Sequence, residues 1–222
     1  MFWGSFSYNM KGPYHCWEPE TAKEKEVAKK EVERMNEELE PLKKEQWELQ
    51  NGLNRLSLRN LPGRKPEWKW KKETGKLSRD GKGGIDWYRY QKTILIPKLF
   101  PFAKEHEKKR PGTLIQEDNA AAHTHYFQQV VYDIHKIRRL IWCANSPDLN
   151  MIEPYWWWMK RRTTKKGAPK NRKDAVRAWK KAWDELEQTQ IQAWIERIMV
   201  HIQQVIKLEG GNEYKEGRAK NR

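Results

Sequence analysis

Two carboxylates near the middle of the chain stand at the ends of short elements that could bring them together. Asp118 closes an apolar segment, residues 114–118, that has the composition of a buried strand. Another apolar segment, residues 137–142, predicts a second strand, and Glu153 follows the turn-forming sequence NSPDLN at the start of a predicted helix. This order of strand, helix, strand, loop and helix can place both carboxylates at the same end of a sheet.

Two carboxylates in such a place are suited to divalent cations. Mg²⁺ prefers oxygen ligands and is commonly held by one or two carboxylates together with substrate phosphates. Two ions about 4 Å apart can activate an attacking oxygen and stabilise the leaving oxygen when a phosphodiester is cleaved. Without other information, structural roles explain these residues at least as well as metal binding does. Asp118 could cap the next helix, and Asn150 and Glu153 fit a capping box. His123 and His125 could be ordinary residues at the start of a helix.

Longer motifs around these carboxylates resemble a known family. The segments QEDNAAAH and ANSPDLNMIEPYW are similar, in this order, to the second and third catalytic blocks of mariner-type DDE transposases. Asp118 then matches the second catalytic Asp and Glu153 the final catalytic Glu, with 34 residues between them. The start of the chain, MFWGSFSYNMKGP, resembles the family's W-G strand and K-G-P hairpin, whereas Ala121 and Met151 replace two prolines usual in the family.

The resemblance implies an α/β fold with a ribonuclease H-like mixed sheet flanked by helices. It also implies cleavage and strand transfer of DNA that depend on two Mg²⁺ (or Mn²⁺) ions, held by three carboxylates, with Asn119 and His123 supporting Asp118 and Glu153. The family's first carboxylate precedes the W-G strand, and the earliest Asp here, Asp80, lies in the loop-like sequence RDGKGG. We therefore expect a catalytic domain truncated at its N-terminus, without the first strand, the first metal ligand or the helix-turn-helix domain of full-length relatives.

Two functions follow as alternatives. One is a transposase catalytic domain that acts in the nucleus on transposon ends and target DNA. The other is a catalytically inactive remnant that binds DNA or associates with itself as a homodimer.

The composition favours a polyanionic partner. The 222 residues include 45 basic and 30 acidic residues, which gives a formal net charge of +15 and a pI near 9.7. Nucleic acid is the first candidate and an acidic membrane surface the second, whereas the alternative is a solvated, highly soluble surface.

Two cysteines without a CxxC motif argue against a disulfide scaffold and a zinc site. No apolar run is long enough to span a membrane, and the first residues do not have the pattern of a signal peptide.

The basic residues are densest directly after the predicted Glu153 helix. Residues 160–173, KRRTTKKGAPKNRK, include eight basic and no acidic residues. We expect them to contact the DNA backbone beside the carboxylates; a nuclear-import signal and a solvated charge run are the alternatives. The predicted DNA-binding residues are Lys160, Arg161, Arg162, Lys165, Lys166, Lys170, Arg172 and Lys173.

The predicted domain organisation places a helical insertion inside the catalytic domain. Residues 1–19 and 84–208 form the predicted ribonuclease H-like domain, and residues 209–222 form a polar tail. Between them, residues 20–83 combine an insertion with a basic linker. Apolar residues recur at heptad spacing over residues 20–58, which predicts a coiled-coil arm or, with Pro41 in its middle, a helical hairpin or kinked arm.

Further elements are predicted from local patterns. Residues 1–18 alternate as a hairpin with its turn at Lys11-Gly12-Pro13. The W-K-W sequence at residues 68–70 fits either base stacking or an edge strand. A helix is expected over residues 86–96, ended by prolines and followed by a charged connection, and residues 172–208 predict two amphipathic helices whose apolar stripes face the core.

Overall fold

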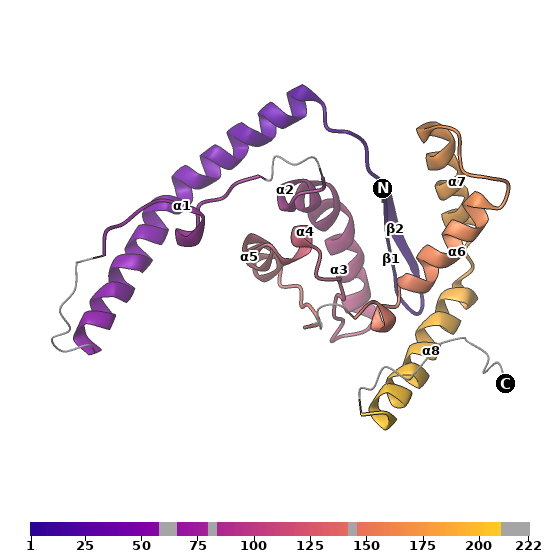
Figure 1. The fold of residues 1–222 in the computed structure, drawn as a ribbon. Helices are drawn as coiled ribbons and strands as arrows, with labels where there is room; N and C mark the ends of the chain where they lie inside the picture. The colour runs from indigo at the N-terminus through magenta and orange to yellow at the C-terminus, as the bar shows by residue number, and fades with distance from the viewer. Residues whose placement is uncertain (58–65, 80–83, 142–145, 210–222) are drawn as a thin grey trace. The chain divides into compact units, whose positions relative to one another are not determined.

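The computed structural model describes residues 1–57, 66–79, 84–141 and 146–209, and these residues are mainly helical (Figure 1). The chain forms two compact units. Unit 1 comprises Met1–Glu18 with Arg89–Arg222, and unit 2 comprises Pro19–Tyr88. Among the helices in the described part of the chain, none is long and apolar enough to cross a membrane.

The predicted ribonuclease H-like mixed sheet is wrong. Within the described residues the only sheet has two antiparallel strands. The two predicted strands do lie side by side in parallel, but they form only one isolated bridge, between Ile115 and Arg139. In this bridge Ile115 N–H donates to Arg138 O (3.0 Å), and Leu140 N–H donates to Ile115 O (2.8 Å). Parallel strands are stable mainly when both faces are covered, and here Leu114 is 47% exposed and Leu140 38% exposed. The pairing therefore does not extend into a sheet.

The N-terminal hairpin is confirmed, although its turn lies elsewhere. Strand β1 (Phe2–Phe6) pairs antiparallel with β2 (Lys11–Cys16), and Phe2 faces Cys16 across the hairpin. The turn is at residues 7–10, where Ser7 N–H donates to Met10 O (2.8 Å). Lys11, Gly12 and Pro13, predicted to form the turn, lie in β2 instead. A two-stranded sheet tolerates Pro13 because a proline can occupy an edge strand.

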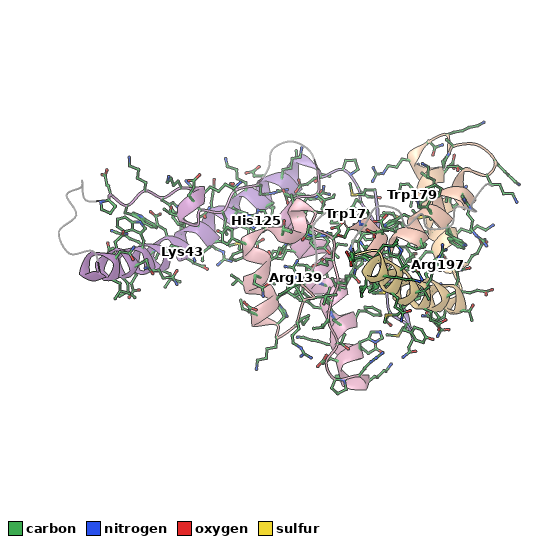
Figure 2. The ribbon with its side chains drawn as sticks, turned by 60° about the horizontal axis from the view of Figure 1, so that its bottom comes forward. Trp17, Lys43, His125, Arg139, Trp179 and Arg197 are labelled. Atoms are coloured by element: carbon green, nitrogen blue, oxygen red, sulfur yellow. The ribbon has the colours of Figure 1, made fainter. Side chains whose placement is uncertain are left out.

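Three helices pack on this hairpin to form a hydrophobic core in unit 1. They are α6 (Glu153–Thr164), α7 (Arg172–Asp184) and α8 (Gln188–Lys207), which confirms the helix beginning at Glu153 and the two amphipathic helices after it. Figure 2 shows their side chains, with Trp179 of α7 and Arg197 of α8 labelled. The buried members of the core are Phe2, Tyr155, Met159, Ala182, Trp183, Leu186 and Ile191. Aromatic rings dominate it, with Tyr155 meeting Trp183 edge to face at 5.0 Å.

A continuous helical segment runs from α2 (Trp87–Tyr90) through the π-helix η2 (Gln91–Leu99) to α3 (Phe100–Lys109). The predicted end before Pro97 and the predicted charged connection over residues 104–110 are therefore wrong. In the π-helical register Phe100 N–H donates to Leu95 O, five residues back, so the ladder passes the missing donor of Pro97. Pro101 falls in the first turn of α3, where a proline needs no partner.

Three short helices complete the described part of unit 1. Helices α4 (Ala121–Thr124) and α5 (Tyr126–Ile134) follow the Ile115 segment, and the 3₁₀ helix η3 (Pro147–Leu149) precedes α6. The predicted tail from Gly210 and Trp142, the last residue of the predicted second strand, lie outside the described residues.

Unit 2 is built on one long helix, α1 (Ala22–Ser57), which excludes the predicted helical hairpin. The helix passes Pro41 without interruption, and its course changes near its middle in Figure 1, as expected of a proline kink. Two segments, residues 76–79 and 84–88, pack along its first half. Asn36 bonds both backbone groups of Leu77, at 2.7 and 2.9 Å, and Tyr88 donates to Glu31 at 2.5 Å.

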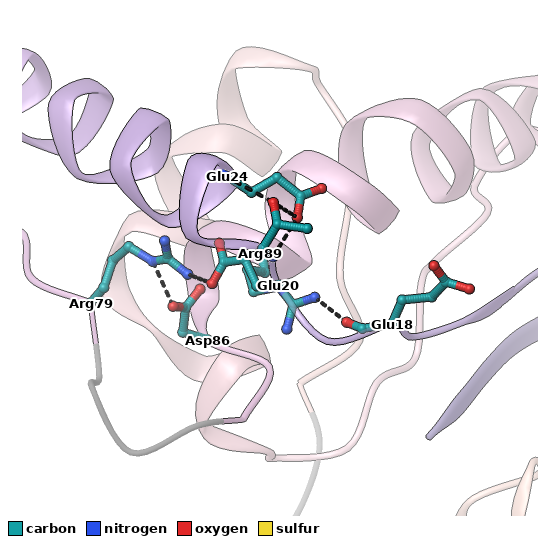
Figure 3. A network of polar contacts seen from close by, with 7 residues as sticks. Glu18, Glu20, Glu24, Arg79, Asp86 and Arg89 are labelled. Carbon is teal, nitrogen blue, oxygen red and sulfur yellow. Dashed lines mark hydrogen bonds and ion pairs between the residues drawn. The ribbon is translucent and has the colours of Figure 1, made fainter. Parts of the chain in front are cut away.

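A nearly buried cluster of ion pairs connects the first residues of unit 2 with its last residues. Arg79 Nη2 lies 2.9 Å from Glu20, and Arg79 Nε lies 2.7 Å from Asp86 (Figure 3). The side chains of Arg79 and Asp86 are only 17% and 6% exposed, so breaking either contact would leave a charge with little water to replace it.

The tryptophans of the basic linker do not form the predicted edge strand. Residues 66–70 are not a strand, and the 3₁₀ helix η1 (Lys72–Thr74) follows them. Trp68 stacks on Trp70 at 5.9 Å and meets Trp47 of α1 at 5.6 Å. These rings therefore pack on one another within unit 2, and much of the remaining linker, residues 58–65 and 80–83, lies outside the described residues.

Candidate functional site

The candidate site lies in unit 1, where the Ile115 segment ends and α6 begins. Asp118 follows the parallel bridge at Ile115, and Glu153 is the first residue of α6. The predicted capping role of Glu153 is not seen: the N-cap residue of α6 is Ile152, without a side-chain cap, and Asn150 Oδ1 accepts from Ile152 N–H at 3.4 Å. The position of Glu153 is therefore not explained by helix capping.

Asp118 is held by two contacts. Its Oδ1 lies 2.6 Å from His123 Nδ1 and accepts from Ala120 N–H at 3.1 Å. The close contact with His123 lowers the pKa of Asp118, with the Ala120 N–H adding to the effect. Both contacts involve Oδ1 and the side chain is 55% exposed, so an ionised carboxylate still faces solvent.

His123 is largely buried behind Asp118. Burial lowers the pKa of His123, but the close contact with Asp118 and the negative charge of Glu117 outweigh burial and raise it overall. The ring also lies 4.2 Å from the ring of Tyr90, measured between centroids. His123 therefore contacts Asp118 directly, whereas exposed Asn119 lies between Asp118 and α4.

The two candidate carboxylates influence each other. Burial raises the pKa of Glu153, and the negative charge of Asp118 raises it further. The segments that carry the two residues are in contact, because Gln116 Nε2 donates to Leu149 O at 3.4 Å. A cation between the two carboxylates would relieve their repulsion.

The buried acidic group of the site is Glu117, to which the sequence analysis assigned no function. Its side chain is 6% exposed and accepts hydrogen bonds from Tyr90 Oη and from Tyr132 Oη, the latter at 2.7 Å. Arg139 Nη2 lies 3.5 Å from the same carboxylate and its guanidinium lies 4.8 Å from the Tyr132 ring centroid. Burial and then the charge of Glu117 raise the pKa of both phenols, so both remain protonated donors.

A period of two along the Ile115 segment is the signal that could have identified Glu117. Alternate residues of an extended segment point to the same side, so Glu117 shares the side of Ile115, which is 8% exposed. Asp118 shares the side of Leu114, which is 47% exposed. Adjacent carboxylates thus have different roles: Glu117 faces the interior, and Asp118 faces solvent.

The carboxylates present fit a cation that also takes ligands from a substrate. Mg²⁺ is often bound by one or two carboxylates plus phosphate oxygens, and Asp118 and Glu153 supply two. In the described part of the chain, no group of three or more His, Cys, Asp or Glu side chains is arranged to hold a metal. The pair is thus suited to sharing one ion with a phosphate, whereas the resemblance implies three carboxylates for two ions.

The motif NSPDLN also has a structural role. Asp148 of η3 lies 2.9 Å from His201 Nε2 of α8, and the His201 side chain is only 5% exposed. This contact fastens the loop before Glu153 to α8. The cysteine that precedes the motif, Cys143, lies outside the described residues.

Six of the eight predicted DNA-binding side chains are exposed and form no ion pair or hydrogen bond with the described residues. Arg162 forms an ion pair with Glu185 at 3.1 Å, and its guanidinium carbon lies 4.3 Å from the centroid of the Trp158 ring. Arg172 donates to Trp17 O. The remaining six are distributed over the end of α6, the loop that follows and the start of α7: Lys160, Arg161, Lys165, Lys166, Lys170 and Lys173.

The three consecutive tryptophans of α6 divide between core and solvent. Trp156 and Trp158 pack against the core of unit 1, which confirms that at least one anchors it. Trp157 is instead 67% exposed.

Comparison with protein-family models gives no match, and no curated protein sequence matches the chain significantly.

Proposed function

We propose that this chain is a DNA-binding protein of DDE transposase ancestry that holds the phosphate backbone on the basic segment after α6. The observation that carries the proposal is the continuity of α6. The helix begins with Glu153, which is coupled to Asp118, and reaches Lys160 and Arg161 about 12 Å farther along its axis. A phosphate backbone bound at the basic end would run towards the two carboxylates. The partner would be DNA, and the protein would act in the nucleus.

The charges support phosphate contact rather than a solvated surface alone. The formal net charge is +15, and residues 160–173 contribute eight positive charges without a compensating acidic residue. If the six exposed side chains each neutralise one phosphate, the logarithm of the binding constant should fall with the logarithm of salt concentration with a slope of about −5.

The test is the salt dependence of duplex binding, measured by fluorescence anisotropy from about 50 to 200 mM salt. Replacing Lys165, Lys166 and Lys170 together by Ala should weaken binding and reduce the slope to about −3. The matched control replaces exposed Lys104, Lys108 and Lys109 of α3 and removes the same charge from the same unit. Equal losses in both triple variants, or a flat salt response, would contradict a phosphate site on this segment.

Cation-assisted cleavage of DNA is the activity that the carboxylate pair would support. Asp118 and Glu153 would hold Mg²⁺ or Mn²⁺, and the bound ion supplies Lewis-acid activation of a water or phosphate oxygen. The chain's own part is to keep Asp118 ionised through His123 and to leave its carboxylate open to solvent. The adjacent basic segment would hold the strand in place.

Nicking of supercoiled plasmid in the presence of Mg²⁺ or Mn²⁺ tests this activity. Asp118→Asn and Glu153→Gln should each abolish nicking while DNA binding persists, because neither change touches the six exposed basic side chains. If the unchanged protein binds DNA but never nicks it, the inactive DNA-binding alternative holds.

Self-association through α1 is a second candidate function. The first half of the heptad seam is covered within unit 2, but in the second half Leu42, Leu49 and Leu53 are 58%, 65% and 52% exposed. Such a stripe is typical of a helix that pairs with another. Sedimentation equilibrium should detect a dimer that Leu49→Glu with Leu53→Glu dissociates. The control Val27→Glu, also exposed on α1 but outside the seam, should leave it intact.

A further inference from the structure

The exposed face of α6 has an unusual composition for a surface helix. Residues of an α-helix are about 100° apart around its axis, so residues 153, 157, 160, 161 and 164 lie within a sector of about 100°. Glu153 is half-buried at the start of this face, and Trp157, Lys160, Arg161 and Thr164 are exposed. Tyr155 and Met159, which are buried in the core, point to the opposite side. The face is therefore not part of the hydrophobic core of unit 1.

Trp157 is the outlier on this face. Of the tryptophans within the described ranges, it alone is largely exposed, at 67%, and its neighbours Trp156 and Trp158 pack on the core. Packing inside the protein therefore does not explain the position of this ring. Large exposed apolar side chains surrounded by polar residues are common at binding sites.

Arg161 makes this ring part of a positively charged surface. Its guanidinium lies 5.6 Å from the centroid of the Trp157 ring, one helical turn away. None of the ion pairs within the described residues involves Arg161, whereas the neighbouring Arg162 is paired with Glu185. Lys160 adds a second exposed charge beside the ring. An accessible indole flanked by two cations suits a ligand that combines a flat ring with negative charge.

We propose that Trp157, with Lys160 and Arg161, is a stacking platform for an unpaired base of a DNA strand. Bases of any sequence present a π face to an aromatic ring, and the flanking phosphates can bind the two cations. Trp157 stands one helical turn, about 6 Å along the axis, from Glu153. This inference rests on the proposed DNA binding and deepens it, because it specifies single-stranded or unpaired DNA as the preferred form beside the carboxylates.

The test compares two ligands with the same protein: an oligonucleotide that is single-stranded and the same sequence as a full duplex. Trp157→Ala should lower affinity for the single strand about 5- to 150-fold, the range expected for one lost stacking contact. Its duplex affinity should change less than about twofold, and the salt slope should stay the same because no charge is removed. Trp157→Phe should retain most of the single-strand affinity because it keeps a ring.

The control and the outcomes separate this inference from the proposed function. Ile206→Ala removes a similarly exposed apolar side chain, 70% exposed, from α8 and should leave both affinities unchanged. Equal losses of single-strand and duplex affinity in Trp157→Ala, or no loss at all, would overturn the stacking platform while DNA binding stands. A change only in sedimentation behaviour would assign the ring to a protein contact and overturn it as well. If neither ligand binds the unchanged protein, the proposed function itself fails.

Discussion

Removing the Glu117 carboxylate should be among the most destabilising single changes in unit 1. Glu117→Ala leaves the hydroxyls of Tyr90 and Tyr132 without their acceptor, and the Tyr90 and Tyr132 side chains are 2% and 0% exposed. It also removes the carboxylate that lies 3.5 Å from Arg139. Breaking a buried charged network from one side typically costs about 3–5 kcal/mol, because the remaining groups lose both the protein partner and water.

Urea unfolding followed by circular dichroism and tryptophan fluorescence measures this cost. With a slope of about 2–3 kcal/mol per molar urea, the expected loss moves the midpoint down by about 1–2 M. Tyr132→Phe removes a single bond to the charged group and should cost only about 1.5–3 kcal/mol. Combining Glu117→Ala with Tyr90→Phe and Tyr132→Phe should recover part of the loss, because fewer buried polar groups are then left without partners.

A loss below about 1 kcal/mol for Glu117→Ala would refute this reasoning. It would mean that water reaches the two phenols, or that Glu117 is not buried as the structure places it. A triple variant less stable than Glu117→Ala alone would locate the cost in lost packing rather than in unsatisfied hydroxyls.

Three further changes test the packing and the charges in the same way. Gly4→Ala would place its Cβ 2.8 Å from the buried Trp183 ring, and it should lower the free energy of unfolding by about 1–3 kcal/mol, measured in urea. In Gly52→Ala of α1 the added Cβ meets no atom within 4 Å, so the variant should raise the free energy of unfolding by about 0.5–1 kcal/mol. A lower free energy of unfolding would contradict the open surface at this position. Burial, with the charge of Lys98 adding to it, lowers the pKa of His15 below 6.5, so the folded state binds a proton less readily than the unfolded state. The stability that neutral His15 contributes should therefore fall as the pH decreases from 6.5 towards the lowered pKa of the folded state. Between neutral and mildly acidic pH, the His15→Gln variant should lose less stability than the unchanged protein. Identical losses in the two proteins would contradict a lowered pKa of His15.

The candidate site could be predicted only in part, and the division follows the range of the interactions. Asp118 and Glu153 were identified from motif residues close to each of them in sequence. Glu117 was given no role because its importance comes from Tyr90, Tyr132 and Arg139, which are 15 to 27 positions away along the chain. Trp157 is exposed because α6 turns its neighbours Trp156 and Trp158 towards the core, and this orientation depends on the helices packed against them.

The fold shows the same division. The N-terminal hairpin, the start of α6 at Glu153 and the helices α7 and α8 follow from alternation, helix-start signals and amphipathic spacing in the sequence itself. The amino-acid sequence also determines the +15 charge and its concentration after α6. Only the tertiary structure decided that the Ile115 segment stops at one bridge, that the helix continues past Pro97, and that one of two adjacent carboxylates is buried. These outcomes depend on which surfaces remain covered once distant segments pack, and local patterns do not contain that information.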